Sequence, residues 1–173
     1  MITYTTGKMH EIVQPIVDQF KAFVEENTDA DPATMLEMVD VYLSAEKDTN
    51  IILAKDGDAL AGFYTWRPFA ESPFLSHNPD LIQKIEQVGF NVSELYNPIL
   101  LMVGASHRRM GISTTMANMV AANCKALGYK GRVFYFITSE SVNQQRLNNH
   151  AGKEIVVDYL DAKGGQITIL PLE

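Results

Sequence analysis

Apolar residues recur at helical spacing along the first quarter of the chain. Residues 9–24 carry them at steps of three and four, which predicts a helix with one buried face, interrupted by Pro15. Asp31 and Pro32 form a helix N-cap followed by a proline in the first turn, so a second amphipathic helix is predicted from there to Leu43. The N-terminal region is therefore expected to be helical.

Short apolar runs predict strands on either side of these helices. Residues 50–54 and 60–67 have the length and side chains of strands, and the Asp-Gly turn in residues 55–58 joins them into a hairpin. Residues 2–5 predict a further short strand.

The centre of the pattern is a strand, a polar turn and a helix. Residues 99–103 form an apolar run of the kind found in strands buried on both faces. From residue 112 apolar side chains recur along one helical stripe, and Gly128 is expected to end that helix. A strand predicted at residues 133–138 completes a β-α-β unit.

The remaining segments give shorter elements. In residues 68–98 helical spacing is confined to the stretch from Leu81 to Val88, because prolines break the rest. The C-terminal part predicts a short helix at 142–151, strands at 154–160 and 166–170, and a turn at 163–165 between those strands. The elements together predict an α/β fold.

Composition limits the class of protein. The chain has 173 residues, of which 46% are hydrophobic and 20% charged, as in an ordinary globular protein, so a single domain over residues 1–173 is expected. Cys124 is the only cysteine, which excludes an internal disulfide and a multi-cysteine metal site. It lies on the apolar stripe of the central helix and is predicted to be a core residue.

The charge and hydropathy of the chain indicate which kinds of partner it can bind. The net charge of −7 arises in residues 1–50, which hold ten acidic and three basic side chains, and this field disfavours a nucleic-acid partner while it could attract an amine. No run of about 18 apolar residues exists, and the N-terminus has neither the basic nor the apolar region of a secretion signal. We therefore expect a cytoplasmic protein with no membrane partner.

The turn before the central helix has the residues of an anion site. The first turn of a helix presents backbone N–H groups without internal acceptors at the positive end of the helix dipole. Gly111 allows close approach of a ligand, Ser113 and Thr114 add hydroxyl donors, and Arg108 and Arg109 add positive charge. A phosphate or pyrophosphate would fit, and an ordinary strand-to-helix turn with surface arginines is the open alternative. Neither a P-loop nor a G-x-G-x-x-G fingerprint occurs in the chain.

This stretch resembles motif A of the GNAT acyltransferase superfamily, in which a strand leads into Q/R-x-x-G-x-G/A and a helix. The motif reads here from Arg108 to Ser113, with serine where the family has glycine or alanine, and Val103 stands at the family's strand position. The hairpin sequence ILAKDGDALAGFYTWRP also resembles the family's second and third strands, with Gly62 at the matching place. The order of predicted elements follows the GNAT plan along nearly the whole chain, and the resemblance implies the fold of that family, a central mixed β-sheet flanked by helices.

The resemblance implies an N-acetyltransferase that moves an acetyl or other acyl group from acetyl-CoA to an amine by direct attack. In the family, backbone amides of the motif hold the pyrophosphate, and the strand before it holds the pantetheine arm. The cofactor-binding residues implied here are Leu101, Met102, Val103, Arg108, Arg109, Met110, Gly111, Ile112, Ser113, Thr114 and Asn143. No metal is expected, because the four histidines are scattered along the sequence.

Catalytic candidates also follow from the resemblance. Many relatives place a tyrosine acid four residues before a closing glycine; with Gly152 as that glycine, the position is Asn148, which can donate a hydrogen bond but cannot protonate a thiolate. Tyr135 is a substitute acid and Glu94 a candidate base. Further candidates for these roles or for an acceptor pocket are Tyr64, Trp66, Glu71, Ser139, Ser141 and His150.

Several alternatives stay open at this point. The chain could be a catalytically impaired GNAT-like module that binds acyl-CoA or another protein, because the usual tyrosine is missing. A transferase acting on nucleic acid is disfavoured, since no basic patch interleaved with aromatic residues occurs. The acceptor is either a small amine or a protein amine, and a homodimer is an open possibility. Residues 68–98 are expected to shape the acceptor site.

Overall fold

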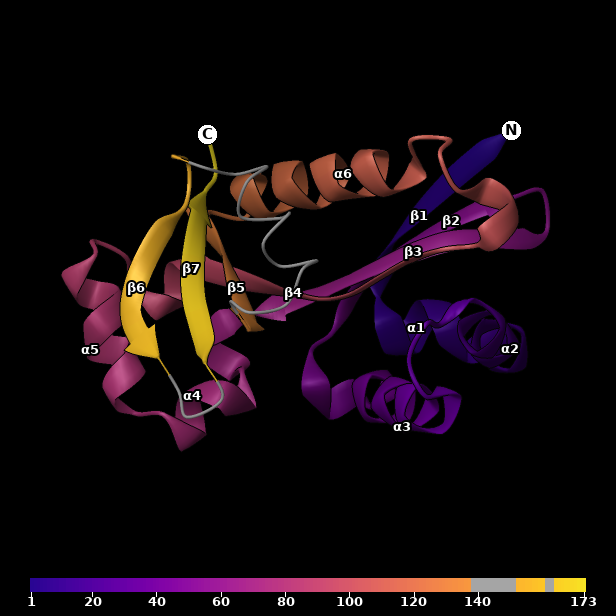
Figure 1. Ribbon diagram of the computed structural model, residues 1–173. Helices are drawn as coiled ribbons and strands as arrows, with labels where there is room; N and C mark the ends of the chain where they lie inside the picture. Colours follow the sequence, from indigo (N-terminus) through magenta and orange to yellow (C-terminus); the bar gives the residue numbers. More distant parts are fainter. Residues whose placement is uncertain (138–151, 161–163) are drawn as a thin grey trace. The chain divides into compact units, whose positions relative to one another are not determined.

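A computed structural model describes residues 1–137, 152–160 and 164–173. Within them the chain forms two compact units (Figure 1), and each unit combines two separate stretches of sequence. Unit 1 comprises residues 1–67 and 98–122, and unit 2 comprises residues 68–97 and 123–173. The helix expected at 142–151 lies outside the described residues. The expectation of one domain over the whole chain stays a prediction.

Within the described residues, seven strands form a mixed sheet, which confirms the predicted fold class. They are hydrogen bonded in the order β1-β2-β3-β4-β5-β7-β6, with β4 and β5 parallel and the C-terminal pair antiparallel. The strands are β1 (Ile2–Lys8), β2 (Asn50–Asp56), β3 (Ala59–Pro68), β4 (Leu95–Val103), β5 (Gly131–Ile137), β6 (Ile155–Leu160) and β7 (Gly165–Pro171). The α-helices are α1 (Met9–Val13), α2 (Val17–Asn27), α3 (Pro32–Leu43), α4 (Pro73–His77), α5 (Asp80–Gln87) and α6 (Ile112–Ala126).

In unit 1, helices cover both faces of the hairpin formed by β2 and β3. Helices α1, α2 and α3 lie on one face and α6 on the other (Figure 1). Ile51 and Leu53 point into the core shared with α1 to α3, whereas Ile52 and Ala54 alternate with them and are equally buried. Phe20 and Phe63 form the centre of that core, with ring centroids 4.7 Å apart. The hairpin is therefore buried on both sides.

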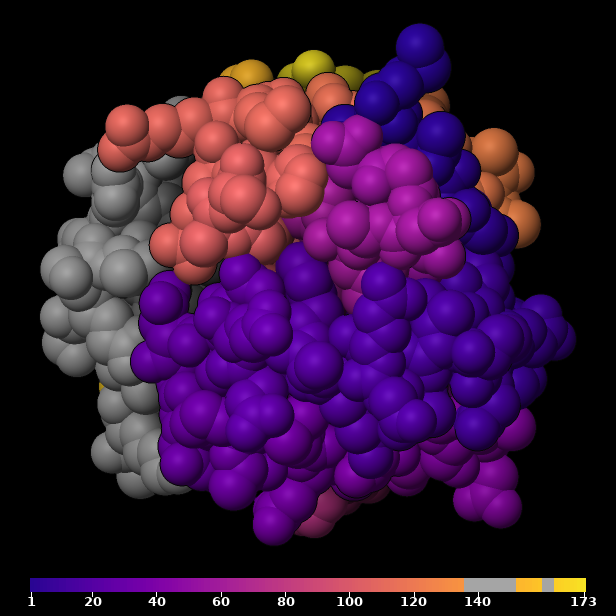
Figure 2. Space-filling view, turned by 90° about the vertical axis from the view of Figure 1, so that its right-hand side faces the viewer, coloured from indigo at the N-terminus to yellow at the C-terminus, as the bar shows by residue number. Residues whose placement is uncertain are grey.

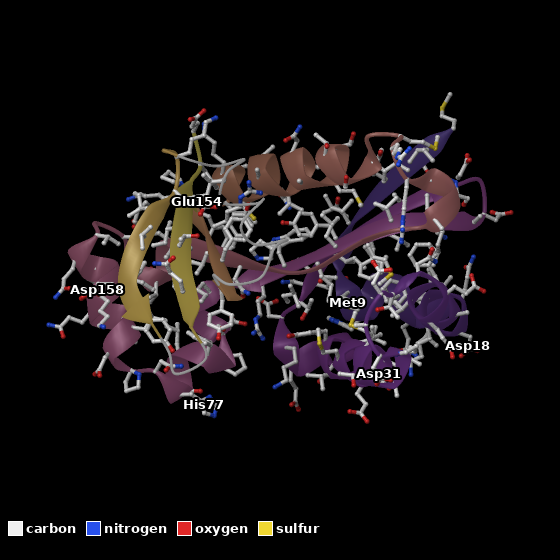
Figure 3. All side chains as sticks on the ribbon, in the orientation of Figure 1. Met9, Asp18, Asp31, His77, Glu154 and Asp158 are labelled. Carbon is white, nitrogen blue, oxygen red and sulfur yellow. The ribbon has the colours of Figure 1, made fainter. Side chains whose placement is uncertain are left out.

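Two predictions about where helices begin and end in unit 1 are confirmed. Pro15 lies in a 3₁₀ turn, Gln14–Ile16, that separates α1 from α2, as expected for a residue without a backbone N–H. Asp31 caps α3, because its Oδ2 accepts a hydrogen bond from the Thr34 backbone N–H at 2.9 Å, and this bond lowers the pKa of Asp31. The side chains of Asp18 and Asp31 are exposed on this helical part (Figure 3).

Strand β4 differs from the sequence prediction in its length and its burial. It begins at Leu95, four residues before the predicted start at Ile99. Residues 99–103 were expected to be buried on both faces, and this prediction is wrong: they are half-buried, and Leu101 is 48% exposed. The physical reason is that Leu101, Met102 and Val103 line a cavity, while Leu100 and Met102 also pack against the core of unit 1.

Unit 2 has its own apolar core. Leu81 and Ile85 of α5 are fully buried, and they pack in one cluster with Val133 of β5 and Ile167 of β7. The helical spacing noted from Leu81 onward is thus confirmed as α5. The short helix α4, which the sequence pattern did not predict, precedes it in the same segment. The terminal strand pair expected from the sequence is formed by β6 and β7.

Cys124 is fully buried on α6, as predicted for a core residue. Burial raises the pKa of the Cys124 thiol to about 12, because the thiolate would lose its hydration. We expect the native protein to react with a thiol reagent at pH 8 far more slowly than the urea-unfolded chain, as measured by the release of a coloured leaving group. Equal rates in the two states would contradict the burial of this side chain.

Candidate functional site

The loop that leads from β4 into α6 is held by hydrogen bonds at its start. The Gly104 N–H donates to the Ala61 carbonyl at 2.9 Å, and the Ala105 N–H donates to Asn27 Oδ1 at 2.8 Å. Asn27 also donates through Nδ2 to the Phe23 carbonyl at 2.8 Å. The end of α2 is therefore bonded to the loop. The sequence carried no signal for this contact, because Asn27 and Ala105 are 78 residues apart.

Gly62 allows β3 to run close to β4 just before this loop. A Cβ atom at residue 62 would lie 2.7 Å from the Met102 carbonyl oxygen, a distance that real side chains do not tolerate. Glycine is therefore required by packing at the position where the hairpin resembles the GNAT pattern. Its effect is to place the end of β4 directly beside β3.

The backbone at the start of α6 leaves a row of amides without acceptors. Arg109 has φ 67° and Gly111 has φ 75°, two left-handed residues that turn the chain sharply before the helix. The first hydrogen bond of the helix runs from the Thr115 N–H to the Gly111 carbonyl at 2.9 Å. The amides of residues 109–114 have no acceptor in the part of the chain that the structure describes. This is the geometry of a helix N-terminus that binds an anion.

Two cavities lie beside these amides. One, of about 290 Å³, is lined by residues of the loop and of the first turn of α6, including His107, Arg108, Gly111 and Thr114. The other, of about 520 Å³, lies between the segment that joins α2 to α3 and the end of β4. Figure 2 shows these neighbouring parts of unit 1, with the N-terminal helices in indigo and purple and the loop in coral. The cavities share the lining residues Val103, Arg108 and Ser113.

The positive side chains around the smaller cavity differ in whether they are paired with a carboxylate. Arg108 and Arg109 are exposed, and no ion pair of theirs is formed with the described residues. His107 Nε2 lies 3.6 Å from Asp56 Oδ2, and its Nδ1 lies 3.0 Å from Ser106 Oγ. The N-terminal ammonium group donates to Asp56 at 2.8 Å and, with a smaller contribution from His107, lowers the pKa of Asp56. The arginines therefore supply positive charge that the neighbouring described side chains do not neutralise.

Comparison with known proteins gives the fold. No family profile matches the chain, and no curated protein matches its sequence. Among solved structures, a protein of Desulfovibrio desulfuricans assigned to the GNAT acetyltransferase family has a TM-score of 0.60 and 14% identity, with 100% of this chain and 99% of that chain covered. The PaiA N-acetyltransferase of Thermoplasma acidophilum, solved with coenzyme A, has a TM-score of 0.60 and 12% identity, and 99% of each chain is covered.

A third neighbour is the ribosomal-protein-S18-alanine N-acetyltransferase of Escherichia coli, with a TM-score of 0.56, 11% identity and coverage of 100% of this chain and 95% of that chain. The protein has the GNAT fold. The resemblance inferred from the sequence is thus confirmed at the level of the fold. At these identities the comparison carries neither the activity nor the substrate over to this chain.

The GNAT fold brings most of the predicted cofactor residues together. Leu101, Met102 and Val103 end β4, and residues 108–114 form the loop and first turn of α6, all in unit 1. Met110 is 59% exposed, while Ile112 is buried and anchors the helix. Asn143 lies outside the described residues. That these residues bind a cofactor stays a prediction.

Of the predicted catalytic residues, Glu94 is engaged in structural contacts. Its carboxylate pairs with Lys130 Nζ at 2.6 Å and accepts from the Asn91 N–H at 3.3 Å in a capping box. These bonds, the one with Lys130 first, lower the pKa of Glu94, so it is a weaker base than an unpaired glutamate.

The other catalytic candidates are scattered over both units. Tyr135 is 43% exposed on β5, with its ring centroid 5.2 Å from that of Phe74. Tyr64 and Trp66, which were candidates for an acceptor pocket, are almost fully buried at 4% and 2% exposure. Glu71 is exposed at the end of a 3₁₀ turn. Asn148, Ser139, Ser141 and His150 lie outside the described residues.

Two further properties concern only the described part of the chain. There, no group of three or more histidine, cysteine, aspartate or glutamate side chains could hold a metal ion. No described helix is long and apolar enough to span a membrane. The cytoplasmic location expected from the sequence stays a prediction.

Proposed function

We propose that the protein is an N-acyltransferase that moves an acetyl or other acyl group from acetyl-CoA to an amine. The observation that carries this proposal is the row of acceptor-free amides at residues 109–114 beside a cavity of about 290 Å³. A diphosphate needs several convergent N–H donors and positive charge, and this turn supplies both. The GNAT fold of the chain and the coenzyme A bound by the Thermoplasma neighbour support it.

The cavities fit the two chemically different parts of acetyl-CoA. Arg108 and Arg109 stand beside the smaller cavity, where the diphosphate would be held by backbone donors and guanidinium groups. The larger cavity is lined by apolar residues, among them Leu101, Met102 and Met35, and by polar ones that include the charged Asp29 and Arg108. Its apolar side suits an uncharged pantetheine arm. This assignment also gives a reason for the exposure of Leu101 at the end of β4.

Transfer by direct attack places simple demands on the protein. Bound acetyl-CoA supplies an activated thioester, and the chain's contribution is to hold it and the amine in reacting geometry. The amine has to lose a proton, and the leaving thiolate has to gain one. We assign Tyr135 as the candidate acid, with Glu94 and Asn148 as the other proposed catalytic residues. Because Lys130 lowers the basicity of Glu94, deprotonation of the amine through water is the simpler route.

The experiment that tests the binding site replaces Gly111 with valine. At φ 75° a β-branched residue is strained by about 1–2 kcal/mol, and its side chain would also project beside the cavity. We expect acetyl-CoA affinity, measured by titration calorimetry, to fall at least about tenfold, which corresponds to about 1.4 kcal/mol. Undiminished affinity would show that the diphosphate does not bind at this turn.

A matched control separates strain from binding. Gly57 has φ 61° at the tip of the hairpin in the same unit, and a Cβ there, as at Gly111, meets nothing within 4 Å. Gly57→Val is therefore expected to destabilise the protein to a similar extent while leaving acetyl-CoA affinity unchanged. If both variants lost affinity equally, the loss at Gly111 would reflect folding and not the site.

A second candidate function is an acyl-CoA-binding module without transfer activity. This function is favoured by the ion pair between Glu94 and Lys130, because the pair makes the candidate catalytic base less basic. The two functions differ in one measurement, the release of free thiol from acetyl-CoA in the presence of a panel of amines. Binding without thiol release for any amine or peptide would support the module and overturn the transferase.

A further inference from the structure

Unit 2 contains a small pocket whose described lining residues include none of the predicted cofactor-binding residues. Its volume is about 120 Å³, and its lining includes the rings of Phe69, Phe74 and Tyr135 and the polar side chains of Ser72 and Asn97. None of the described residues that line it is charged. A cavity needs a volume of only about 10–15 Å³ to hold one water molecule, so a pocket of about 120 Å³ can hold an organic group. Drug-sized ligands occupy about 300–1,000 Å³, so that group is one ring or a short chain.

The wall formed by α4 is held rigidly by hydrogen bonds. Ser72 is buried and caps the helix by accepting from the Phe74 N–H at 3.4 Å. Asn78, just after the helix, donates through Nδ2 to the Phe74 carbonyl at 2.9 Å and accepts from the Tyr159 hydroxyl of β6 at 3.0 Å. The backbone of Phe74 is therefore held to the strands of unit 2 before any ligand binds, and its ring packs against that of Tyr159 with centroids 5.7 Å apart.

The opposite wall depends on a glycine. A Cβ at Gly165 would lie 2.2 Å from the Tyr135 hydroxyl oxygen and 2.4 Å from its ring, so only glycine on β7 leaves room for this ring. The Tyr135 ring also packs at 51° to the Phe74 ring and is still 43% exposed. The exposed part of a held aromatic ring is a surface that a second ring can cover.

We infer that this pocket binds the aromatic ring of a small ligand, and that arylalkylamines belong to this class of ligand. An aromatic ligand is favoured because edge-to-face and offset packing of rings add attraction beyond burial, whereas a flexible alkyl chain gains only burial. The absence of charged groups among the described lining residues disfavours a polyamine there. That such an amine is also acetylated rests on the proposed transferase function; that the pocket binds a ring does not.

The test uses 2-phenylethylamine and its saturated analogue 2-cyclohexylethylamine. Binding of each amine to the full-length protein is measured by saturation-transfer NMR without acetyl-CoA, and KM for each is measured from thiol release. Phe74→Leu keeps most of the apolar volume but removes the ring. We expect it to weaken 2-phenylethylamine binding at least about fivefold, while 2-cyclohexylethylamine changes little. Phe74→Ala is expected to weaken both.

Controls keep folding and function apart. Ile82→Ala, on the exposed side of α5 and away from the pocket, is expected to leave the binding of both amines unchanged. If ring binding depends on Phe74 but no amine releases thiol, the pocket assignment stands and the transferase proposal fails. If thiol is released equally with ring-free amines, and Phe74→Leu changes neither KM nor NMR signal, the pocket assignment fails and the transferase stands. A preference for octanoyl-CoA over acetyl-CoA that is lost in Phe74→Ala would also overturn the pocket assignment, because the pocket would then bind the acyl chain.

Discussion

Replacing Arg108 and Arg109 together with glutamate is expected to weaken acetyl-CoA binding at least about 100-fold. Both side chains are exposed beside the cavity at the start of α6, and hydrogen bonds to charged groups contribute about 1.5–3 kcal/mol each. Reversal also places negative charge next to the amides where a diphosphate would bind. Calorimetric titration at low salt measures the effect, and the difference from the unmodified protein should shrink as salt screens it.

The control for this variant has the same net charge. Lys47 and Lys153 are both exposed and line neither cavity beside α6, so Lys47→Glu with Lys153→Glu exchanges two positive for two negative charges elsewhere. We expect this double variant to lose no more than about twofold in affinity, because salt screens exposed charges that make no direct contact with the ligand. An equal loss in both variants would mean that overall charge, and not the turn before α6, governs binding.

Replacing Phe63 with alanine is expected to produce the largest loss of stability. Phe63 is fully buried, and its ring lies 4.7 Å from that of Phe20 and 6.2 Å from that of Phe23. Removing a buried phenylalanine side chain costs about 3–5 kcal/mol, since burial is lost and a cavity is left. Urea unfolding followed by the fluorescence of Trp66, the only tryptophan and 2% exposed in the same unit, measures the change.

Leu101→Ala is the informative comparison for stability. This leucine is also a large apolar residue of the sheet, but it is 48% exposed and lines a cavity. We expect its replacement to cost less than about 1 kcal/mol, because little burial is lost. A loss as large as that of Phe63→Ala would show that the end of β4 is packed in the core, and would remove the proposed pantetheine surface.

The sequence predicted those parts of the site that depend on neighbouring residues. The turn from Arg108 to Ser113 and the helix after it are local, because helix starts, glycine conformations and amide donors are set within a few residues. Gly111 has the positive φ expected of a residue in such a turn. Arg109 has one as well, and no sequence rule indicated it for a non-glycine residue.

Contacts between distant residues could not be read from spacing. The bond from Ala105 to Asn27 and the ion pair of Glu94 with Lys130 join segments that the sequence separates widely. The second contact matters for function, because it changes the basicity of a residue that the sequence analysis had proposed as a catalytic base. A side chain's chemistry depends on its partners, and those partners are selected by the fold.

The sequence by itself determined most of the helices, the hairpin and the row of amide donors at the start of one helix, because hydrophobic periodicity and turn chemistry act over short stretches of chain. Only the tertiary structure decided that residues 101–103 line a cavity, although they end an apolar run of the kind found in buried strands. It also decided that rings from residues 69, 74 and 135 share one pocket. Burial is a property of what lies across from a residue, and the residue's own sequence neighbours do not specify that.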